Sequence, residues 1–440
     1  MVLIHLGVTL KSKTLYLIFL IFTTKVYAID LCDILKGKQR SQGAKSCPTI
    51  KKGNLLHRLH KESSVIIGQP IDLNYSHTLI DILNQLPKDL QKNILLSHEI
   101  SHVTTQLISN YKNVKLLKYH GEDFTWAQDF LPFITDKNGR KSIFNIPYPD
   151  EYIRSTSSKL AKSCQISELN TFKKGFDYEK VGPGDFGGNI YPLTDKTLFV
   201  GDNISEEVIS KLEKNTDQQI EIIDTSWFET GHVDEVISLL PGVLKKDQKS
   251  CDFTVAIPSP SLAMNLINMD ITQREELINF KDYLNETSDA YYNCLQLLAE
   301  SKKDNFSSKL CRSFRDYNLE MDKIFNRNLE TVKKALKRID KCDLKSIIPL
   351  PVLLAPIDKT SDKSVLGYSR FITFNPINNI LIEKQVILPK QNYTPFTEYI
   401  NETLKRLKLN TSYVNSSFLQ YLAGGPHCNV KVIRTCKSTN

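Results

Sequence analysis

The sequence predicts a mixed α/β fold that contains a helical insert. Three stretches, at residues 94–117, 197–223 and 380–414, repeat an order of short apolar strand, amphipathic helix and second strand. A long segment between the second and third stretches shows only helical spacing. Hydrophobic residues make up 41% of the 440-residue chain and charged residues 24%, which is typical of a globular protein and excludes a wholly disordered chain.

Apolar periodicity predicts the individual elements of these stretches. Strands are expected at residues 94–96, 114–117, 197–200, 220–223, 380–382, 386–388 and 411–414. Helices are expected between them at residues 100–108, 206–212 and 396–407. In the helical segment, apolar residues alternate at spacings of four and three along one face: Phe325, Leu329, Val332, Leu336 and Ile339. That helix is expected to end near Asp340 and to belong to a packed helical insert.

The N-terminus is typical of an exported protein. Lys11 and Lys13 precede an apolar run at residues 15–22, and Val26-Tyr27-Ala28 fits a cleavage site, so residues 1–28 are predicted to be a signal peptide. A buried N-terminal strand is the alternative. No apolar run is long enough to span a bilayer, so we expect no stable membrane insertion and a secreted or periplasmic location. Residues 29–92 are expected to form an N-terminal extension and residues 93–440 the main domain.

Cysteine content and charge agree with export. Nine cysteines allow at most four intrachain disulfides and leave one thiol over. Cys32 and Cys47 are expected to form a local disulfide in the N-terminal extension. The formal net charge of +8 includes Lys11, Lys13 and Lys25 of the signal segment. The remaining excess favours solubility, and no nucleic-acid partner is predicted.

Four short motifs carry the residues that could perform chemistry. They are Trp126-Ala127-Gln128-Asp129, the glycine-rich segment at residues 182–189, Gly231-His232-Val233-Asp234-Glu235, and Gly424-Gly425-Pro426-His427-Cys428-Asn429. Each motif alone is explained as well by packing or by a turn. Together they describe one reaction, because carboxylates bind a guanidinium bidentately, a thiolate attacks its central carbon, and a histidine transfers protons. The candidate set is Asp129, His232, Asp234 and Cys428.

The order of these motifs resembles the catalytic domain of protein-arginine deiminases. The string at residues 187–190 and the Gly-Gly-Pro-His-Cys segment also resemble agmatine deiminases. Stretches at residues 326–329, 347–349 and 375–379 follow in the same order as similar stretches of the animal enzymes. The resemblance runs from about residue 93 to the C-terminus. It implies a pentein fold, in which ββαβ modules surround a pseudo-fivefold axis with the ligand site at the centre.

The resemblance also implies roles for single residues. Asp129 and Asp234 would bind the guanidinium, His232 would be the acid and base, and Cys428 would be the nucleophile. Trp126 would wall the substrate channel. The products would be citrulline and ammonia, formed through a covalent thiouronium intermediate.

The sequence departs from the calcium-dependent animal enzymes at positions where those enzymes carry acids. Pro132 and Tyr191 stand at these places, and neither offers a carboxylate to calcium. We therefore expect no cofactor and no calcium requirement. No arginine clearly matches those that hold the substrate backbone, and Arg154 is the candidate for that role.

Three alternatives stay open from the sequence. His98-Glu99-Ile100-Ser101-His102 matches a zinc-peptidase motif, with Glu122 as a possible third ligand. A second alternative is a secreted binding module that kept the pentein fold without catalysis. The third keeps the chemistry but acts on agmatine or free arginine, whereas export favours an arginine-containing peptide or protein as substrate. If Cys428 is the nucleophile, Cys436 is expected to pair with another cysteine.

Overall fold

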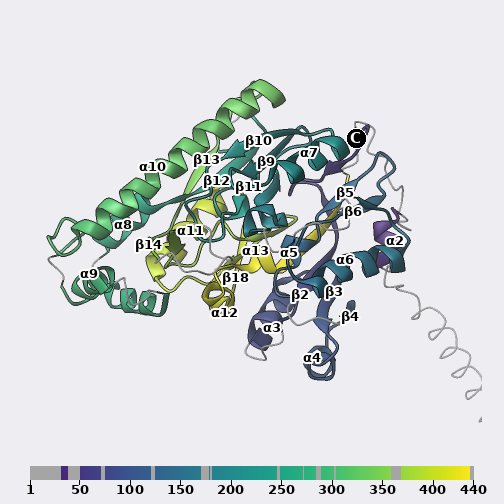
Figure 1. Ribbon diagram of the computed structural model, residues 1–440. Helices are drawn as coiled ribbons and strands as arrows, with labels where there is room; N and C mark the ends of the chain where they lie inside the picture. Colours follow the sequence, from purple (N-terminus) through teal and green to yellow (C-terminus); the bar gives the residue numbers. More distant parts are fainter. Residues whose placement is uncertain are drawn as a thin grey trace, which may run out of the picture.

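The computed structural model describes residues 31–37, 50–70, 75–119, 124–169, 178, 181–244, 248–270, 272–283, 289–301, 304–357 and 368–436. These residues form a mixed α/β fold with six sheets (Figure 1). The predicted signal peptide and Cys47 lie outside the described residues. Within the described part, no helix is both long and apolar enough to cross a membrane.

Five of these sheets contain the same unit, in which an antiparallel strand pair is followed by helical structure and by a strand parallel to the second member of the pair. The first is β5 (Phe133–Thr135), β6 (Lys141–Phe144), α6 (Glu151–Cys164) and β7 (Glu168–Leu169), with β1 (Asn54–Leu55) added at the edge. The second is β8 (Ile190–Pro192), β9 (Thr197–Gly201), α7 (Glu206–Asn215) and β10 (Gln219–Ile223). The third is β11 (Ser238–Pro241), β12 (Phe253–Ser259), a helical insert and β13 (Ile347–Pro351). The fourth is β16 (Ile380–Ile382), β17 (Gln385–Pro389), α11 (Thr394–Arg406) and β18 (Asn410–Val414).

The fifth unit joins the two ends of the chain. Its antiparallel pair is β19 (Val430–Thr435) with β2 (Lys61–Gly68), followed by α3 (Ser76–Gln85) and β3 (Gln91–Ser97). After α4 (Ser101–Ile108), β4 (Val114–Tyr119) extends this sheet. The expected boundary at residue 92 falls inside β3, and the expected N-terminal extension supplies β2, a central strand of this sheet. The sixth sheet pairs β14 (Leu354–Pro356) with β15 (Ser369–Phe371).

The elements predicted from periodicity are confirmed, each within a few residues of its expected bounds. The helical insert is also confirmed and consists of α8 (Pro260–Met269), the 3-10 segment η6 (Arg274–Tyr283), α9 (Asp289–Glu300) and α10 (Arg312–Ala335). In Figure 1, α10 runs along one edge of the molecule. It continues as a π-helical turn to Asp340, and its buried Phe325, Leu329 and Val332 join the core that also contains β12 residues.

Disulfides connect distant segments. Cys251 pairs with Cys342 and Cys294 with Cys311. Cys32 pairs with Cys164, so the expected Cys32–Cys47 bond is wrong. The physical reason is the apolar face of α2 (Leu31–Leu35), whose leucines and Ile34 are buried in the same cluster as residues of α6 and bring Cys32 to that helix.

Candidate active site

The four candidate residues lie in loops that precede the first strand of a unit. Asp129 belongs to α5 (Ala127–Phe130), before β5. His232 and Asp234 lie in and beside the 3-10 turn η5 (Val233–Glu235), before β11. Cys428 belongs to α13 (Pro426–Asn429), before β19. The fold brings these loops together and buries all four residues, each of which is 4% exposed or less.

The side chains of Asp129 and His232 both approach the backbone of Gly188. The Oδ1 atom of Asp129 accepts a hydrogen bond from the Gly188 backbone N–H at 3.0 Å and lies 3.8 Å from Nδ1 of His232. A Cβ atom at residue 188 would lie 2.4 Å from that Nδ1 and 2.9 Å from that Oδ1. Gly188 is therefore required so that the carboxylate and the imidazole can approach the same stretch of backbone.

Asp234 presents a carboxylate oxygen that no described residue satisfies. Its Oδ2 atom pairs with Nδ1 of His427 at 2.8 Å, whereas its Oδ1 atom is buried and without a hydrogen-bond partner. A buried acceptor without a partner costs about 1–3 kcal/mol, more when charged. The arrangement therefore favours a ligand that carries N–H donors.

Cys428 is the free thiol among the described cysteines, and Cys436 is disulfide-bonded. The expectation that Cys436 does not pair with Cys428 is confirmed. The thiol lies 3.4 Å from Oε1 of Glu235, and the amide Nδ2 of Asn378 donates to the sulfur at 2.9 Å and to Oε1 of Glu235 at 2.6 Å. The Oδ1 atom of Asn378 accepts the His427 backbone N–H at 2.7 Å.

Sequence reasoning missed Glu235 and Asn378 as parts of the site. Both had a signal. Glu235 is the last residue of the Gly231–Glu235 motif, and Asn378 lies in the stretch 375–379 that entered only as a marker of resemblance. A second amide, Asn375 Nδ2, donates to Oε2 of Glu235 at 2.7 Å and fixes the carboxylate.

The family model of protein-arginine deiminase (PAD) matches residues 194–439, which is more than half of the chain. The chain belongs to the protein-arginine deiminase family. It is accordingly a hydrolase of the guanidino-modifying class. A search among curated proteins finds no match to this deiminase.

Solved structures share the fold of this deiminase at low sequence identity. A protein provisionally named a peptidyl-arginine deiminase is 15% identical with a TM-score of 0.55, over 87% of this chain and 99% of that one. The C. jejuni agmatine deiminase with substrate bound is 12% identical with a TM-score of 0.51, over 88% and 97%. The Enterococcus faecalis agmatine deiminase is 11% identical with a TM-score of 0.50, over 89% and 98%. These likenesses show the mixed α/β fold.

Burial shifts the titration of the deiminase site. Desolvation raises the pKa of Asp129 to about 6 and that of Asp234 to about 6, while the charge of His232 lowers both. Burial, followed by the charge of Asp234, raises the pKa of Glu235 to about 7. Burial and the neighbouring carboxylates raise the pKa of the Cys428 thiol well above its usual value. Burial thus shifts these four groups toward their protonated forms, and a bound cation would lower each of their pKa values.

Trp126 lies beside Gly424 of the Cys428 loop, and Arg154 contacts Tyr148, Pro149 and Tyr178. The half-buried Trp126 indole would contact a Cβ at Gly424 at 2.5 Å, so the glycine gives the ring its place beside the Cys428 loop. Nη1 of Arg154 donates to the carbonyls of Tyr148 and Pro149, both at 2.5 Å, and its Cζ lies 3.7 Å from the Tyr178 ring centroid.

An aromatic chain connects the Arg154 region with the site. The ring of Tyr148 stacks on Phe186 with centroids 4.4 Å apart, and Phe186 meets His232 edge-on at 6.3 Å. No contact between Arg154 and any of the four candidate residues is found in the described part of the chain. The role of Arg154 in holding the substrate backbone stays a prediction.

The zinc-peptidase alternative finds no support. His98 and Glu99 precede α4, which begins at Ser101, so the two histidines of the motif do not lie one turn apart on a helix. Among the described residues, neither group with the spacing of metal ligands includes His98 or His102. Glu122 lies outside the described residues.

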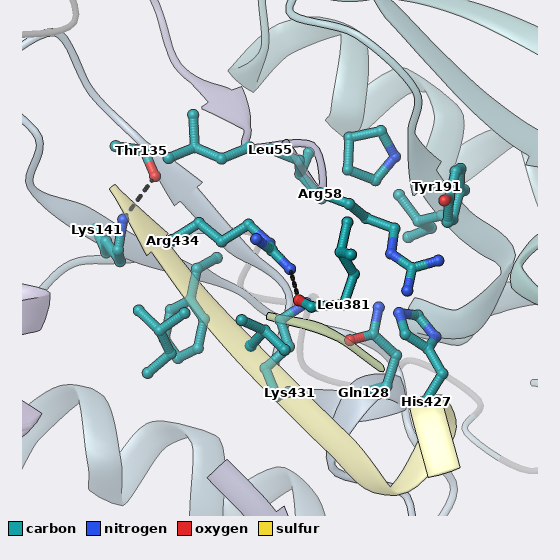
Figure 2. A pocket seen from close by; sticks show the side chains of 16 residues that line it. Leu55, Arg58, Gln128, Thr135, Lys141, Tyr191, Leu381, His427, Lys431 and Arg434 are labelled. Atoms are coloured by element: carbon teal, nitrogen blue, oxygen red, sulfur yellow. Dashed lines mark hydrogen bonds between the residues drawn. The ribbon is translucent and has the colours of Figure 1, made fainter. Parts of the chain in front are cut away.

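A cavity of about 60 Å³ borders the site at His427 and Gln128 (Figure 2). It is lined by residues of β5, β8, β16 and β19, the first strands of four units, and four basic side chains contribute to its wall: Arg58, Lys141, Lys431 and Arg434. Lys431 lowers the pKa of Asp129 and Asp234, Arg58 lowers that of Asp234, and Arg434 pairs with Glu62 at 2.6 Å. Lys431 and Arg58 thus partly offset the effect of burial on the site carboxylates.

Proposed function

We propose that this protein hydrolyses the guanidinium of arginine side chains in peptides or proteins to citrulline and ammonia. The observation that carries the proposal is the buried Oδ1 atom of Asp234, which lacks a partner in a cluster that also holds a free thiol. A planar guanidinium supplies the paired N–H donors that such an oxygen needs. Family membership supports the same reaction class.

In the proposed first step, Asp129 and Asp234 bind the guanidinium as carboxylates. The cation lowers the pKa of the nearby thiol, and the thiol proton passes from Cys428 to Glu235, 3.4 Å away. The thiolate then attacks the central carbon and forms a carbon–sulfur bond. Asn378 stabilises the developing thiolate through its amide N–H.

In the proposed second step, His232 transfers protons. Its imidazolium protonates the departing amino group, the carbon–nitrogen bond breaks, and ammonia leaves a cationic thiouronium on Cys428. Neutral His232 then removes one proton from water as the hydroxyl adds to the same carbon. When the carbon–sulfur bond breaks, the hydroxyl proton is taken up by ammonia, and Cys428 regains its proton from Glu235.

We also propose that the five units form the ring of a pentein fold. Two arrangements support this. The site residues occupy equivalent loops, since Asp129, Gly188, Glu235, Asn378 and Cys428 each lie shortly before the first strand of a different unit. The first strands of four units line one cavity, as inner strands around an axis would.

The proposed location is extracytoplasmic, and no calcium is proposed to take part. The disulfides agree with an oxidising compartment, because such bonds persist there. Pro132 and Tyr191 are both buried, and the Tyr191 hydroxyl accepts the Leu239 backbone N–H at 2.9 Å, which gives it a structural role. The proposed partner is an arginine-containing peptide or protein, and no nucleic acid is proposed.

One assay separates this function from its alternatives. Citrulline formation would be measured on an arginine peptide and on free arginine, and ammonia release on agmatine, each with calcium and with chelator. We expect peptide turnover that survives chelation and disappears in Cys428→Ala. Turnover of agmatine or free arginine alone would support the same reaction but show that the substrate is a small molecule and not a peptide. Folded protein that turns over none of the three would favour the non-catalytic binding module.

A further inference from the structure

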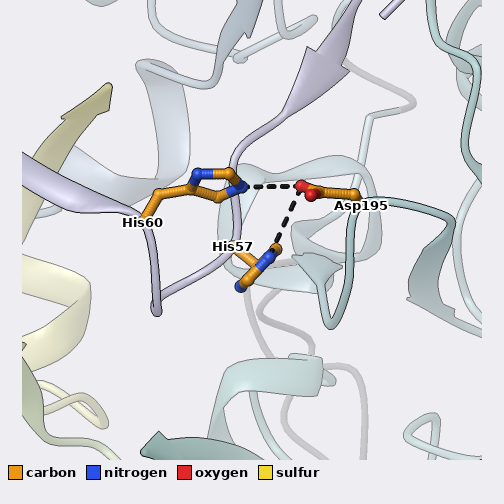
Figure 3. A group of neighbouring side chains, drawn as sticks. All are labelled: His57, His60 and Asp195. Carbon is orange, nitrogen blue, oxygen red and sulfur yellow. Dashed lines mark hydrogen bonds and ion pairs between the residues drawn. The ribbon is translucent and has the colours of Figure 1, made fainter. Parts of the chain in front are cut away.

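Two histidines and one carboxylate face one another outside the catalytic cluster (Figure 3). His57 and His60 lie in the link between β1 and β2, and Asp195 lies in the turn between β8 and β9. The Oδ1 atom of Asp195 is 2.6 Å from Nε2 of His60 and 3.4 Å from Nε2 of His57. The proposed reaction uses none of these residues.

The backbone on both sides of this group is held in place. The His60 backbone N–H donates to the His57 carbonyl at 3.1 Å, and this turn sets the two imidazole rings 4.3 Å apart. On the other side, Nδ2 of Asn54 donates to the Asp195 carbonyl at 2.9 Å, and Asp340 accepts from the neighbouring Thr194 hydroxyl at 2.8 Å. Only the Asp195 side chain, 46% exposed, reaches solvent freely.

We propose that His57, His60 and Asp195 bind one zinc-class divalent cation. Two imidazole nitrogens and one carboxylate oxygen form a ligand set that zinc and its first-row neighbours favour, and the fourth position is left for water. Calcium and magnesium prefer all-oxygen sets of six or more ligands, which this group does not offer. The site is separate from Cys428 and its carboxylates, and it takes no part in the proposed hydrolysis.

The distances between the three ligand atoms show which side chain has to move when zinc binds. Ligand atoms about 2.0–2.1 Å from a tetrahedral zinc are about 3.3 Å from one another. The 3.4 Å separation of His57 and Asp195 already fits, while the 2.6 Å separation of His60 and Asp195 must widen by rotation of the exposed carboxylate. Coordination through Nε2 of His57 places the ring proton on Nδ1, so the 3.3 Å contact of that atom with the Leu59 N–H is given up.

Metal binding would connect two parts of the fold. The link that carries His57 and His60 also carries Leu55 and Arg58, which line the basic cavity. Arg58 donates to the Asn379 carbonyl at 2.5 Å and to the Ser238 hydroxyl, so it attaches the link to two further units. A cation on Asp195 would fix this segment against the β8–β9 turn and stabilise the cavity wall.

The test measures zinc binding in a protein that lacks the catalytic thiol. Because Asp234, Glu235 and Cys428 also lie within ligand distance of one another, all variants carry Cys428→Ala. Equilibrium dialysis against zinc chloride is expected to show one zinc per chain, with cobalt chloride giving the visible spectrum of a tetrahedral site. His60→Ala and Asp195→Asn are each expected to weaken binding by about 100-fold or more, since changes in supporting residues alone cost 10–100-fold.

Matched controls distinguish the site from surface histidines. His77→Ala removes an exposed histidine on α3 and is expected to leave affinity and stoichiometry unchanged. Asp195→Asn changes a half-exposed side chain with little change in volume, and its thermal unfolding without zinc reports whether it folds. Equal zinc affinity in the parent, His60→Ala and Asp195→Asn proteins would overturn the proposal, as would the absence of stoichiometric zinc in the parent.

Discussion

The side-chain amide of Asn378 donates a hydrogen bond to the sulfur of Cys428 at 2.9 Å. The two residues are 50 positions apart, and each lies just before the first strand of its unit. Because Asn378 also binds Glu235 and the backbone of His427, one buried amide positions the thiol, its proton acceptor and the helix that carries it.

Replacement of Asn378 tests this arrangement. Asn378→Ala removes the donor to the sulfur, so the thiolate loses a hydrogen bond worth about 1.5–3 kcal/mol. We expect about 10- to 100-fold slower alkylation of Cys428 by iodoacetamide at neutral pH and a comparable loss of kcat/KM. The exposed Asn326→Ala on α10 is the control. Alkylation at the parental rate would show that the amide does not act on the thiolate.

Glu235→Gln tests the proton acceptor. The substitution keeps the shape of the side chain and one oxygen that can accept from Asn375 or Asn378, but it removes the base, so we expect kcat to fall about 100-fold or more. In the parent, activity is expected to fall as pH drops through about 7, because protonation of Glu235 removes the acceptor. Initial rates across pH measure both effects. A variant with the parental kcat would show that another group accepts the thiol proton.

Lys431→Met tests the role of the basic cavity. The ammonium of Lys431 favours the ionised forms of Asp129 and Asp234, so its removal raises their pKa values above about 6. If the ionised carboxylates bind substrate, the acidic limb of kcat/KM moves to higher pH. The exposed Lys405→Met on α11 is expected to leave the profile unchanged. Coincident profiles of the Lys431 variant and the parent would contradict the charge compensation.

Gly188→Ala tests the close approach of His232 and Asp129. The new Cβ would lie 2.4 Å from Nδ1 of His232, so the imidazole has to move away from the carboxylate. We expect activity to be lost and the free energy of unfolding to fall by about 1–3 kcal/mol, because the added methyl group overpacks a buried site. Near-parental turnover would mean that His232 is not held in the geometry described.

The disulfide between Cys32 and Cys164 is expected to stabilise the fold more than the one between Cys294 and Cys311. The Cys32–Cys164 bond joins residues with a sequence separation of 132, whereas the Cys294–Cys311 bond joins residues with a separation of 17. Loop-closure entropy predicts losses of about 5 and about 3 kcal/mol in the free energy of unfolding when each pair is replaced by serine. Chemical denaturation of the two double variants measures this. The reverse order would show that the N-terminal helix contributes little to the folded state.

Local pattern predicted seven of the nineteen described strands and four of the described α-helices. The strands around residues 94–117 and 380–414 and the long helix that ends near Asp340 follow from apolar spacing over a few neighbouring residues. The resemblance supplied Asp129, His232, Asp234 and Cys428, because each lies in a short motif that is readable without knowledge of its partners. Tertiary packing then placed all four in one buried cluster.

Contacts between distant segments were not predictable in this way. No feature of the sequence around Cys32 indicates that its partner is Cys164. The disulfide follows from the packing of α2 on α6. Residues 61–68 have no local sign that β19, from the other end of the chain, is their neighbour. The His57–His60–Asp195 group likewise requires the β1–β2 link to meet the β8–β9 turn.

The amino-acid sequence thus determined part of the secondary structure, the helical insert and the residues that can perform deiminase chemistry, because these depend on side-chain type and on spacing along the chain. Only the tertiary structure decided that Glu235 and Asn378 contact the thiol and that basic residues line a cavity beside the carboxylates. Those outcomes depend on which loops the five units bring together and on how far burial removes each charge from water.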